Sequence, residues 1–356
     1  MVRRLTQRDI AIFAGVSQAT VSLVLNEAKS AEGRIPPETR ERVLKAIRDT
    51  GYVADPIARS MVKGANRILG VFTYQPAFPI AQADFYTPFL MGIEEEAERL
   101  GYDLLLMTAA ARDDNGRKRI FGETGRLRLA DGCLILGSQF DRDELAQLVA
   151  GDYPYVAVGR RDDAGGPVRY VGADYVTATH ALVREALVAG HRRFAFIGAT
   201  GPAESISDRW RGFLAAIEGA AELVYSHESE NGDPAEQLTA VRASGASVVF
   251  FAEVAEAVVF DNHARAQGVS VPGDLSIVVL GSGTRTHTLR LQRVFTSYAI
   301  PREEMGRQAT SMLVETLTSP TGPVRQILLG CDIVAGETLA SPTQGPTQGP
   351  TQGKRT

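Results

Sequence analysis

One face of a short segment near the N-terminus carries side chains that can recognise another molecule. The residues left on that face are Gln18, Ala19, Ser22, Leu23 and Asn26. The amide of Gln18 can donate and accept hydrogen bonds together, as a bidentate pair with adenine requires, and Ala19 and Leu23 offer apolar contact, for instance to a thymine methyl. This face is therefore free to contact another molecule through one amide, small polar groups and apolar surface.

Two short helices joined by a glycine turn are expected to hold that face. Thr6 can cap the first helix, with Asp9 closing a capping box, and Gly15 ends it. Ser17 can cap the second helix. Apolar stripes at helical spacing are Ile10, Phe13 and Ala14 in the first helix and Val21, Val24 and Leu25 in the second. This pattern is typical of the helix-turn-helix, whose second helix enters the DNA major groove, although any small helical hairpin shows the same spacing.

A third helix and a marginal segment follow. The third helix is predicted over 37–50, with Pro37 at its first position, Gly51 as its stop, and Val43, Leu44 and Ile47 as its apolar side. It completes a three-helix core. Residues 52–64 contain helix start and stop signals, but about eight residues are too few for a stable helix. We expect this segment to be disordered until it is held, and an ordinary interdomain linker is the alternative.

From Ile68 onward, apolar β-type runs alternate with helical stretches. Strands are predicted over 68–74, 102–108, 132–136, 155–159, 193–199, 247–252 and 275–280. Helices are predicted over 88–100, 176–189, 205–218, 255–267 and 301–318. This alternation indicates parallel sheets covered on both faces. A stretch of about 270 residues favours two lobes over one.

Charge is distributed unevenly along the 356 residues. Residues 1–63 hold 11 lysines and arginines against seven acids, a surplus of +4, and because the whole chain carries −4, the remainder carries −8. A basic head on an acidic body suits attraction to phosphate at one end. A surplus of this size is common on proteins that bind no nucleic acid.

Composition limits the class of protein to which the chain can belong. An apolar share of 44% allows a sizeable core. No run approaches the roughly 20 apolar residues of a membrane helix, and MVRRLTQRD lacks the apolar segment of a signal peptide, so we expect a cytoplasmic protein. Cys133 and Cys331 lie in apolar, strand-like stretches and are expected to be reduced core thiols. The three PTQG repeats from Pro342 onward are too rich in proline and glycine to form a core.

The segments GVSQATVSLVLN and RIPPETRERVLKAIRDTGYVADPIARSM resemble the lactose-repressor family of bacterial transcription regulators. In the body, DFYTPFLMGIEEEAERLGYDLLL, ADGCLILGS, VGADYVTATHALVREALVAGHRRFAFIG and PREEMGRQA are similar to its ligand-binding part, and the resemblance covers roughly residues 5 to 340. It implies an all-α helix-turn-helix head and an α/β bilobed body of the periplasmic-binding-protein type, with two parallel-sheet, Rossmann-like subdomains. The expected boundaries are 1–51 for the head, 52–66 for the hinge helix and linker, 67–340 for the effector-binding and dimerisation body, and 341–356 for a disordered tail.

The resemblance assigns DNA contacts by position. Ser17 and Thr20 are expected to hold phosphates, Gln18, Ala19 and Leu23 to face base edges, and Asn26 to contact the backbone. The full set of expected contacts is Thr6, Ser17, Gln18, Ala19, Thr20, Ser22, Leu23, Asn26, Arg59, Ser60 and Met61. Met61 stands where the family usually has a leucine that wedges into the minor groove of the operator, and methionine has a similar volume. Because few charged side chains on this face can contact bases, affinity for DNA is expected to depend on phosphate contacts and on the kink that the hinge helix makes in the DNA.

The resemblance also predicts an effector cleft between the lobes. Its expected residues are Phe85, Tyr86, Ser138, Asp174, Arg209, Glu253 and Ser282. The guanidinium of Arg209 suits hydroxyls or a carboxylate, and a charge on a surface helix is the alternative for this residue.

The body departs from the family pattern in several places, and the proline pair expected before the FTS stretch at 295–297 is absent. Glu253 and Val254 replace an Asn-Asp pair, the segment from Gly281 to Thr284 replaces a Gly-aromatic-Asp-Asp run, and Tyr175 replaces the asparagine after Asp174. These departures remove usual acceptors of sugar hydroxyls and put an ordinary hexose in doubt.

The expected function is that of a homodimeric, sequence-specific DNA-binding regulator, usually a repressor, whose hold on a pseudo-palindromic operator is set by a small-molecule effector. The alternatives are a regulator of the same family that needs no effector and a solute-binding protein without a regulatory role. No cofactor, metal or membrane partner is expected. The five histidines show no metal-ligand spacing or nucleophile motif and are interpreted as helix or surface residues, so no enzyme activity is predicted.

Overall fold

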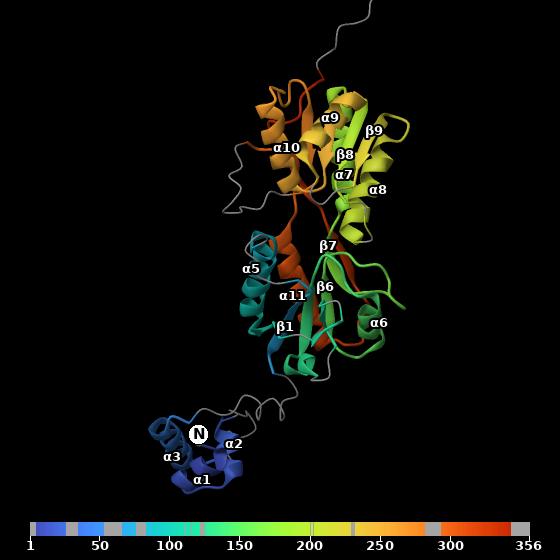
Figure 1. Cartoon of the computed structure of the whole chain (residues 1–356). Coiled ribbons are helices and arrows are strands. Elements are labelled where there is room, and N and C mark those ends of the chain that lie inside the picture. The colour runs from blue at the N-terminus through green and yellow to red at the C-terminus, as the bar shows by residue number, and fades with distance from the viewer. Residues whose placement is uncertain are drawn as a thin grey trace, which may run out of the picture. The chain divides into compact units, whose positions relative to one another are not determined.

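The computed structural model describes residues 5–25, 35–52, 66–75, 83–109, 111–114, 116–121, 125–199, 201, 203–228, 232–281 and 293–342. The chain divides into two compact units, Met1–Arg67 and Ile68–Thr356. Figure 1 traces both from blue to red. Of the expected hinge and linker at 52–66, residues 53–65 lie outside the described residues, and these include Arg59, Ser60 and Met61. Asn26, Ser282 and the tail from Thr343 also lie outside them.

The first unit is a three-helix head. Its helices are α1 (Gln7–Ala14), α2 (Gln18–Leu25) and α3 (Pro37–Thr50). The predicted capping box of α1 is confirmed, because the Asp9 amide donates to Thr6 Oγ1 at 3.3 Å and the Thr6 amide donates to Asp9 Oδ2 at 2.8 Å. Gly15 ends α1 with a φ of 63°, a left-handed conformation that glycine adopts at no steric cost.

The core of the head is formed by small and β-branched side chains. Its buried residues are Ile10, Ala11, Ala14, Val21, Val24, Val43, Ala46 and Tyr52. The expectation that Phe13 is buried was wrong, because its side chain is 63% exposed. Each helical residue turns by about 100°, so the stripe made by Ile10, Ala11 and Ala14 leaves Phe13 on the flank of α1. Alanines at the contact allow the three helices to approach closely.

The second unit contains two lobes, each built on a six-stranded sheet. The N-lobe sheet has the order β13-β7-β6-β5-β1-β2 and all its pairs are parallel. Its strands are β1 (Ile68–Thr73), β2 (Asp103–Met107), β5 (Gly132–Leu136), β6 (Tyr155–Val158), β7 (Tyr170–Ala173) and β13 (Gln326–Leu329). A small hairpin of β3 (Ala111–Arg112) and β4 (Lys118–Arg119) and a 3-10 turn η2 (Arg126–Leu129) belong to the same lobe.

Helices cover both faces of the N-lobe sheet. Figure 1 shows α5 (Ala83–Leu100) and α11 (Arg302–Thr318) on one face and α6 (Arg142–Ala150) on the other. Two glycines allow α5 and α11 to touch, because a Cβ on Gly92 would lie 1.9 Å from the Glu303 carbonyl oxygen and one on Gly306 would lie 2.3 Å from that of Phe89. Helix α5 begins five residues before the predicted start, and Pro88 lies inside it.

The C-lobe sheet has the order β14-β12-β11-β10-β8-β9, with only the β12–β14 pair antiparallel. Its strands are β8 (Arg193–Ile197), β9 (Glu222–His227), β10 (Val248–Phe251), β11 (Ser276–Val279), β12 (Thr296–Ala299) and β14 (Asp332–Val334). The helices are α7 (Tyr175–Ala189), α8 (Glu204–Ile217), α9 (Pro234–Ser244) and α10 (Val254–Ala266). Side chains of α7 and α8 pack on one face of the sheet and those of α9 and α10 on the other.

The chain crosses between the lobes three times, from β7 to α7, from β12 to α11 and from β13 to β14. The predicted fold class is confirmed, since a helical head precedes two α/β lobes with largely parallel sheets. All seven predicted strands exist, but five other strands of the two main sheets (β7, β9, β12, β13 and β14) were missed.

Two smaller expectations were wrong. His191 is neither helical nor on the surface, because it is 1% exposed and its ring nitrogens lie 2.8 Å from Ser247 Oγ and 2.8 Å from the Ala340 carbonyl oxygen. Cys331 is half-buried between β13 and β14 and lies in neither strand, whereas Cys133 is a buried thiol of β5 as expected. Burial raises the pKa of Cys133 to about 12 and that of Cys331 to about 11, so both are protonated at neutral pH.

Membrane-spanning segments were sought among the described helices. No single one has the length and apolar character to cross a bilayer, and one bent pair, α1 with α2, meets the length and composition test jointly.

Candidate functional site

The outer face of α2 carries the side chains that were expected to read bases. Gln18, Ala19 and Leu23 are exposed, whereas Val21 and Val24 on the opposite face are buried in the head. No residue from Gln18 to Leu25 is charged. The face therefore presents one amide, small polar groups and apolar surface.

Two predicted phosphate ligands begin the same helix. The Thr20 amide donates to Ser17 Oγ at 3.1 Å, and the Ser17 and Thr20 hydroxyls lie 2.9 Å apart. Ser17 is thus confirmed as the cap of α2, with its hydroxyl exposed. Thr6, also among the expected contacts, is exposed but held by its capping box with Asp9. Ser22 is half-buried on the flank of α2.

The second group of predicted residues lies in the body, around the crossovers between the lobes. In the N-lobe, the Tyr86 hydroxyl donates to Gln75 Oε1 at 2.6 Å, and Gln75 Nε2 donates to Ser138 Oγ at 3.1 Å. Tyr86 is 3% exposed, and burial raises its pKa to about 12, so it stays a neutral donor. The structure therefore connects predicted residues Tyr86 and Ser138 through Gln75, which the sequence did not indicate.

Arg209 of α8 lies against two tyrosines of the C-lobe. Its Nε donates to the Tyr298 hydroxyl at 3.0 Å, and its guanidinium carbon is 4.1 Å from the Tyr175 ring centroid. Burial opposes the charge of Arg209, but the Tyr298 and Tyr175 phenols and the Glu253 carboxylate outweigh it and raise the pKa of the guanidinium. Arg209 is therefore a partly buried cation on an aromatic platform, and the alternative of a surface helix charge was wrong.

Arg302, the first residue of α11, enters the same region from another crossover. It is 8% exposed, and its guanidinium carbon lies 5.1 Å from the ring centroid of Phe85. Burial lowers its pKa, although a guanidinium remains charged at neutral pH. Phe85 itself is 37% exposed and makes an edge contact with Tyr86 at 5.1 Å. Nothing in the sequence pattern distinguished Arg302 beyond its position after Pro301.

The remaining predicted effector residues are Asp174, Glu253 and Ser282. Asp174 caps α7, because its Oδ1 accepts from the Thr177 amide at 3.0 Å. Glu253 is the exposed N-cap residue of α10, and its carboxylate interacts electrostatically with Arg209 and Arg302. Ser282 lies outside the described residues.

Buried ion pairs join the lobes beside this cluster. Arg160, which follows β6 in the N-lobe, forms two hydrogen bonds to Asp208 of α8, with Nε–Oδ2 2.5 Å and Nη2–Oδ1 2.9 Å. Its neighbour Arg161 contacts Glu204 of the same helix, with Nη1–Oε2 3.2 Å. The Arg161 guanidinium carbon also lies 3.9 Å from the Phe140 ring centroid. No sequence pattern indicates these ion pairs, because the partners are more than 40 positions apart.

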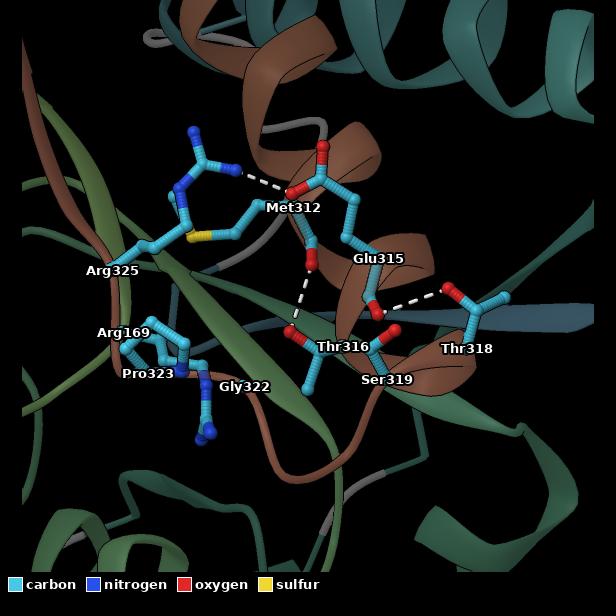
Figure 2. A pocket seen from close by; sticks show the side chains of 9 residues that line it. All are labelled: Arg169, Met312, Glu315, Thr316, Thr318, Ser319, Gly322, Pro323 and Arg325. Carbon is cyan, nitrogen blue, oxygen red and sulfur yellow. Dashed lines mark hydrogen bonds and ion pairs between the residues drawn. The ribbon is translucent and has the colours of Figure 1, made fainter.

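A hollow of about 250 Å³ lies near the C-terminal end of α11. Figure 2 shows its lining, which consists of Arg169, Met312, Glu315, Thr316, Thr318, Ser319, Gly322, Pro323 and Arg325. Arg325 is ion-paired with Glu315. Because the 17 residues of α11 span about 25 Å, this hollow is separate from the cluster around Arg302. None of the residues predicted for an effector lines it.

Comparisons with known proteins match both units. Residues 6–55 match the model described as bacterial regulatory proteins, lacI family, and residues 183–339 match the periplasmic binding protein-like domain. The transcriptional regulator CelR of Thermobifida fusca is 29% identical over 340 residues, 92% of this chain and 96% of that protein. The transcriptional repressor CytR of Escherichia coli K12 is 26% identical over 346 residues, 95% of this chain and 97% of that protein.

Solved structures with the same fold include regulators bound to DNA and to a sugar. The lac repressor dimer bound to operator and the anti-inducer ONPF aligns with a TM-score of 0.74 and 19% identity, over 95% of this chain and 100% of that one. The CelR–cellobiose complex aligns with a TM-score of 0.61 and 24% identity, over 94% of this chain and 100% of that one.

Proposed function

Because the chain belongs to the lacI family of bacterial regulatory proteins, we propose that it represses transcription by binding a pseudo-palindromic operator as a homodimer. Each head places α2 in a major groove, and the two-fold axis of the dimer fixes the spacing of the half-sites. A small molecule in the inter-lobe cleft alters the affinity for the operator. The single observation that carries this proposal is the exposed recognition face of α2, held by two confirmed helix caps within the matched residues 6–55.

On the DNA side, Gln18 is the residue that selects a base. Its exposed amide can pair with adenine, and such a bidentate contact is worth about 1–3 kcal/mol of discrimination. Ser17 and Thr20 lie at the start of α2, where hydroxyls and backbone amides suit a phosphate oxygen. Ala19 and Leu23 add apolar contact. Thr6, Ser22, Asn26, Arg59, Ser60 and Met61 complete the proposed set of contacts.

On the effector side, the cleft is formed by Phe85, Tyr86, Ser138, Asp174, Arg209, Glu253 and Ser282. Gln75 and Arg302 join this set from the geometry. A ligand that touches both lobes favours their closed arrangement, and it can shift the DNA-bound population by no more than its differential affinity for the two arrangements. The hinge at 52–66 is the segment that we propose transmits this change to the head.

The proposed boundaries are a head over 1–51, a hinge over 52–66, a body over 67–340 and a tail over 341–356. We propose that the chain works in the cytoplasm, where operator DNA is accessible, and we assign it no catalytic activity.

Gln18→Ala tests the DNA contact. Binding-site selection from a random duplex library with the wild-type chain gives a motif, and the variant should lose preference at one base pair in each half-site, by about 10-fold or more. Gln147→Ala, an exposed glutamine of α6, is the matched control and should leave the motif unchanged. An unchanged motif for the Gln18 variant would show that Gln18 does not select a base.

A regulator of the same family that needs no effector is the second candidate. The buried bridges from Arg160 to Asp208 and from Arg161 to Glu204 favour it, because they already join the two lobes without a ligand. Operator binding that stays constant across metabolites that raise the melting temperature of the body would support this candidate.

A further inference from the structure

Three arginines from three parts of the chain act on one tyrosine, Tyr175. Arg161 follows β6, Arg209 lies on α8 and Arg302 begins α11. The guanidinium carbon of Arg209 lies 4.1 Å from the Tyr175 ring centroid, and the Tyr175 phenol interacts electrostatically with Arg209 and Arg302 and also with Arg161. Arg161 is 3% exposed and Arg302 is 8% exposed. Such a concentration of buried cations is costly unless negative charge compensates it.

The acids of the described residues compensate this charge only in part. Glu204 pairs with Arg161 at 3.2 Å. Within the described part of the chain, neither Arg209 nor Arg302 has a carboxylate oxygen within 4.0 Å. Glu253 acts on both from an exposed position, and Asp174 uses an oxygen to cap α7. A positive surplus therefore remains at Arg209 and Arg302.

Two guanidinium nitrogens also lack partners. The Nε atoms of Arg161 and Arg302 are buried and have no hydrogen-bond acceptor among the described residues. Leaving a buried donor without an acceptor costs free energy, and the cost is larger when the donor is charged. The groups that guanidinium forks fit best are carboxylate and phosphate oxygens.

The N-lobe side of the cleft has a different chemistry. Gln75, Tyr86 and Ser138 form a chain of neutral donors and acceptors, and the ring of Phe85 lies between this chain and Arg302. Neutral groups of this kind suit hydroxyls, and an aromatic face suits the apolar side of a sugar ring.

We propose that the effector is a small hydroxylated organic anion, whose carboxylate or phosphate binds Arg209 and Arg302 and whose hydroxyls face Gln75, Tyr86 and Ser138. This inference rests on the proposed effector role of the cleft. It also accounts for the departures from the family pattern, because a cleft that loses acidic hydroxyl acceptors and keeps buried arginines favours an anion over a neutral sugar.

Matched pairs of ligands test the charge requirement on the full chain. Gluconate and cellobionate are compared with glucose and cellobiose, with glucose 6-phosphate as the phosphate arm, by thermal shift and calorimetry at low and moderate salt. We expect an anion to bind at least 10-fold more tightly than its neutral counterpart, with an affinity that falls as salt rises. The two anionic arms decide between carboxylate and phosphate. Equal binding of neutral and anionic members, or binding of neutral members alone, overturns the proposal, as does the absence of binding by any anion.

Arg302→Gln tests whether Arg302 binds the anion. It should weaken anion binding at least 10-fold and leave the melting temperature of the ligand-free chain unchanged or raised, because it removes a buried charge. Arg184→Gln, an exposed arginine of α7, makes the same charge change and should bind the anion normally. Normal anion binding by the Arg302 variant overturns its assignment.

The two proposals can fail separately. Site-specific DNA binding without anion binding retains the regulator and rejects the anionic effector. Anion binding without site-specific DNA binding does the opposite.

Discussion

The exposed face of α2 in the head and the arginine cluster of the body (Arg161, Arg209 and Arg302) differ in charge, burial and spacing along the chain. Helix α2 has no charged residue and its outer side chains are exposed, whereas the cluster contains Arg161 and Arg302 as buried cations beside Arg209. Side-chain caps begin α1 and α2, and these two helices pack on α3 around one buried core. In the cluster, Arg161 Nε and Arg302 Nε are buried and have no hydrogen-bond partner among the described residues. The difference is that the face of α2 presents uncharged groups on a formed surface, while the cluster holds buried positive charge that the described residues balance only in part.

The largest expected effect comes from one buried charge in the core of the head, which should unfold the head and leave the body folded. Val21 is fully buried in the head, and Val21→Asp places a carboxylate among only eight buried residues. The cost of several kcal/mol should unfold the head and reduce site-specific DNA affinity by about 100-fold or more. The melting transition of the body should stay unchanged. Val188→Asp, at a valine that is 80% exposed on α7, is the control. A lower melting temperature of the body in the Val21 variant would show that the two units do not fold independently.

The converse test acts on the body. Gly92→Ala places a Cβ 1.9 Å from the Glu303 carbonyl oxygen, so α5 and α11 must separate. We expect a loss of about 1–3 kcal/mol in the free energy of unfolding of the body, measured by urea denaturation. Gly330→Ala, whose Cβ would have no described atom within 4 Å, should be neutral. Equal stability of the two variants would contradict the close contact of these helices.

The ion pair between the lobes, Arg160–Asp208, should contribute more to the free energy of unfolding than an exposed ion pair within the C-lobe. Asp208→Ala leaves Arg160, whose side chain is 16% exposed, without its bidentate partner and should cost about 3 kcal/mol. Glu222→Ala breaks the Arg193–Glu222 pair, whose side chains are 50% and 68% exposed, and should cost less than about 1 kcal/mol. Similar losses in urea denaturation would mean that burial does not strengthen the bridge.

The smallest expected effect concerns pH. Burial lowers the pKa of His191 in the folded state below its ordinary value, so the unfolded chain takes up the proton first as the pH falls. The stability contributed by neutral His191 is therefore present above about pH 6.5 and declines below it. His191→Gln should show a smaller loss of stability between pH 7.5 and 5.5 than the wild type, measured by urea midpoints. His180→Gln, on the exposed side of α7, should keep the wild-type slope. If all three chains lost stability equally between pH 7.5 and 5.5, His191 would not be the group responsible for that loss.

The sequence predicted the head and much of the body because their signals are local. Thr6, Asp9 and Gly15 lie within ten positions and define α1, and alternating apolar runs gave the fold class. Phe13 was misplaced because periodicity does not say which side of a short helix faces its neighbours. Strands β9 and β13 were missed because they lie at sheet edges, where their side chains are partly exposed, and because neither contains a long apolar run.

The contacts around Arg209 in the body were predicted less completely because their partners are distant in sequence. Arg209 and Tyr298 are 89 positions apart, and Arg160 and Asp208 are 48 apart. Resemblance to the family located Arg209, but Gln75 and Arg302 carry no local pattern that distinguishes them from surface residues. Only the three crossovers bring these side chains together.

The most direct test of the central claim is the ratio of affinities of the purified chain for its selected site and for a scrambled duplex of equal length, at 150 mM salt. A regulator built as described should prefer a pseudo-palindromic site by about 10³-fold or more. A ratio near one, with or without hydroxylated anions, would contradict the claim that the head reads DNA sequence.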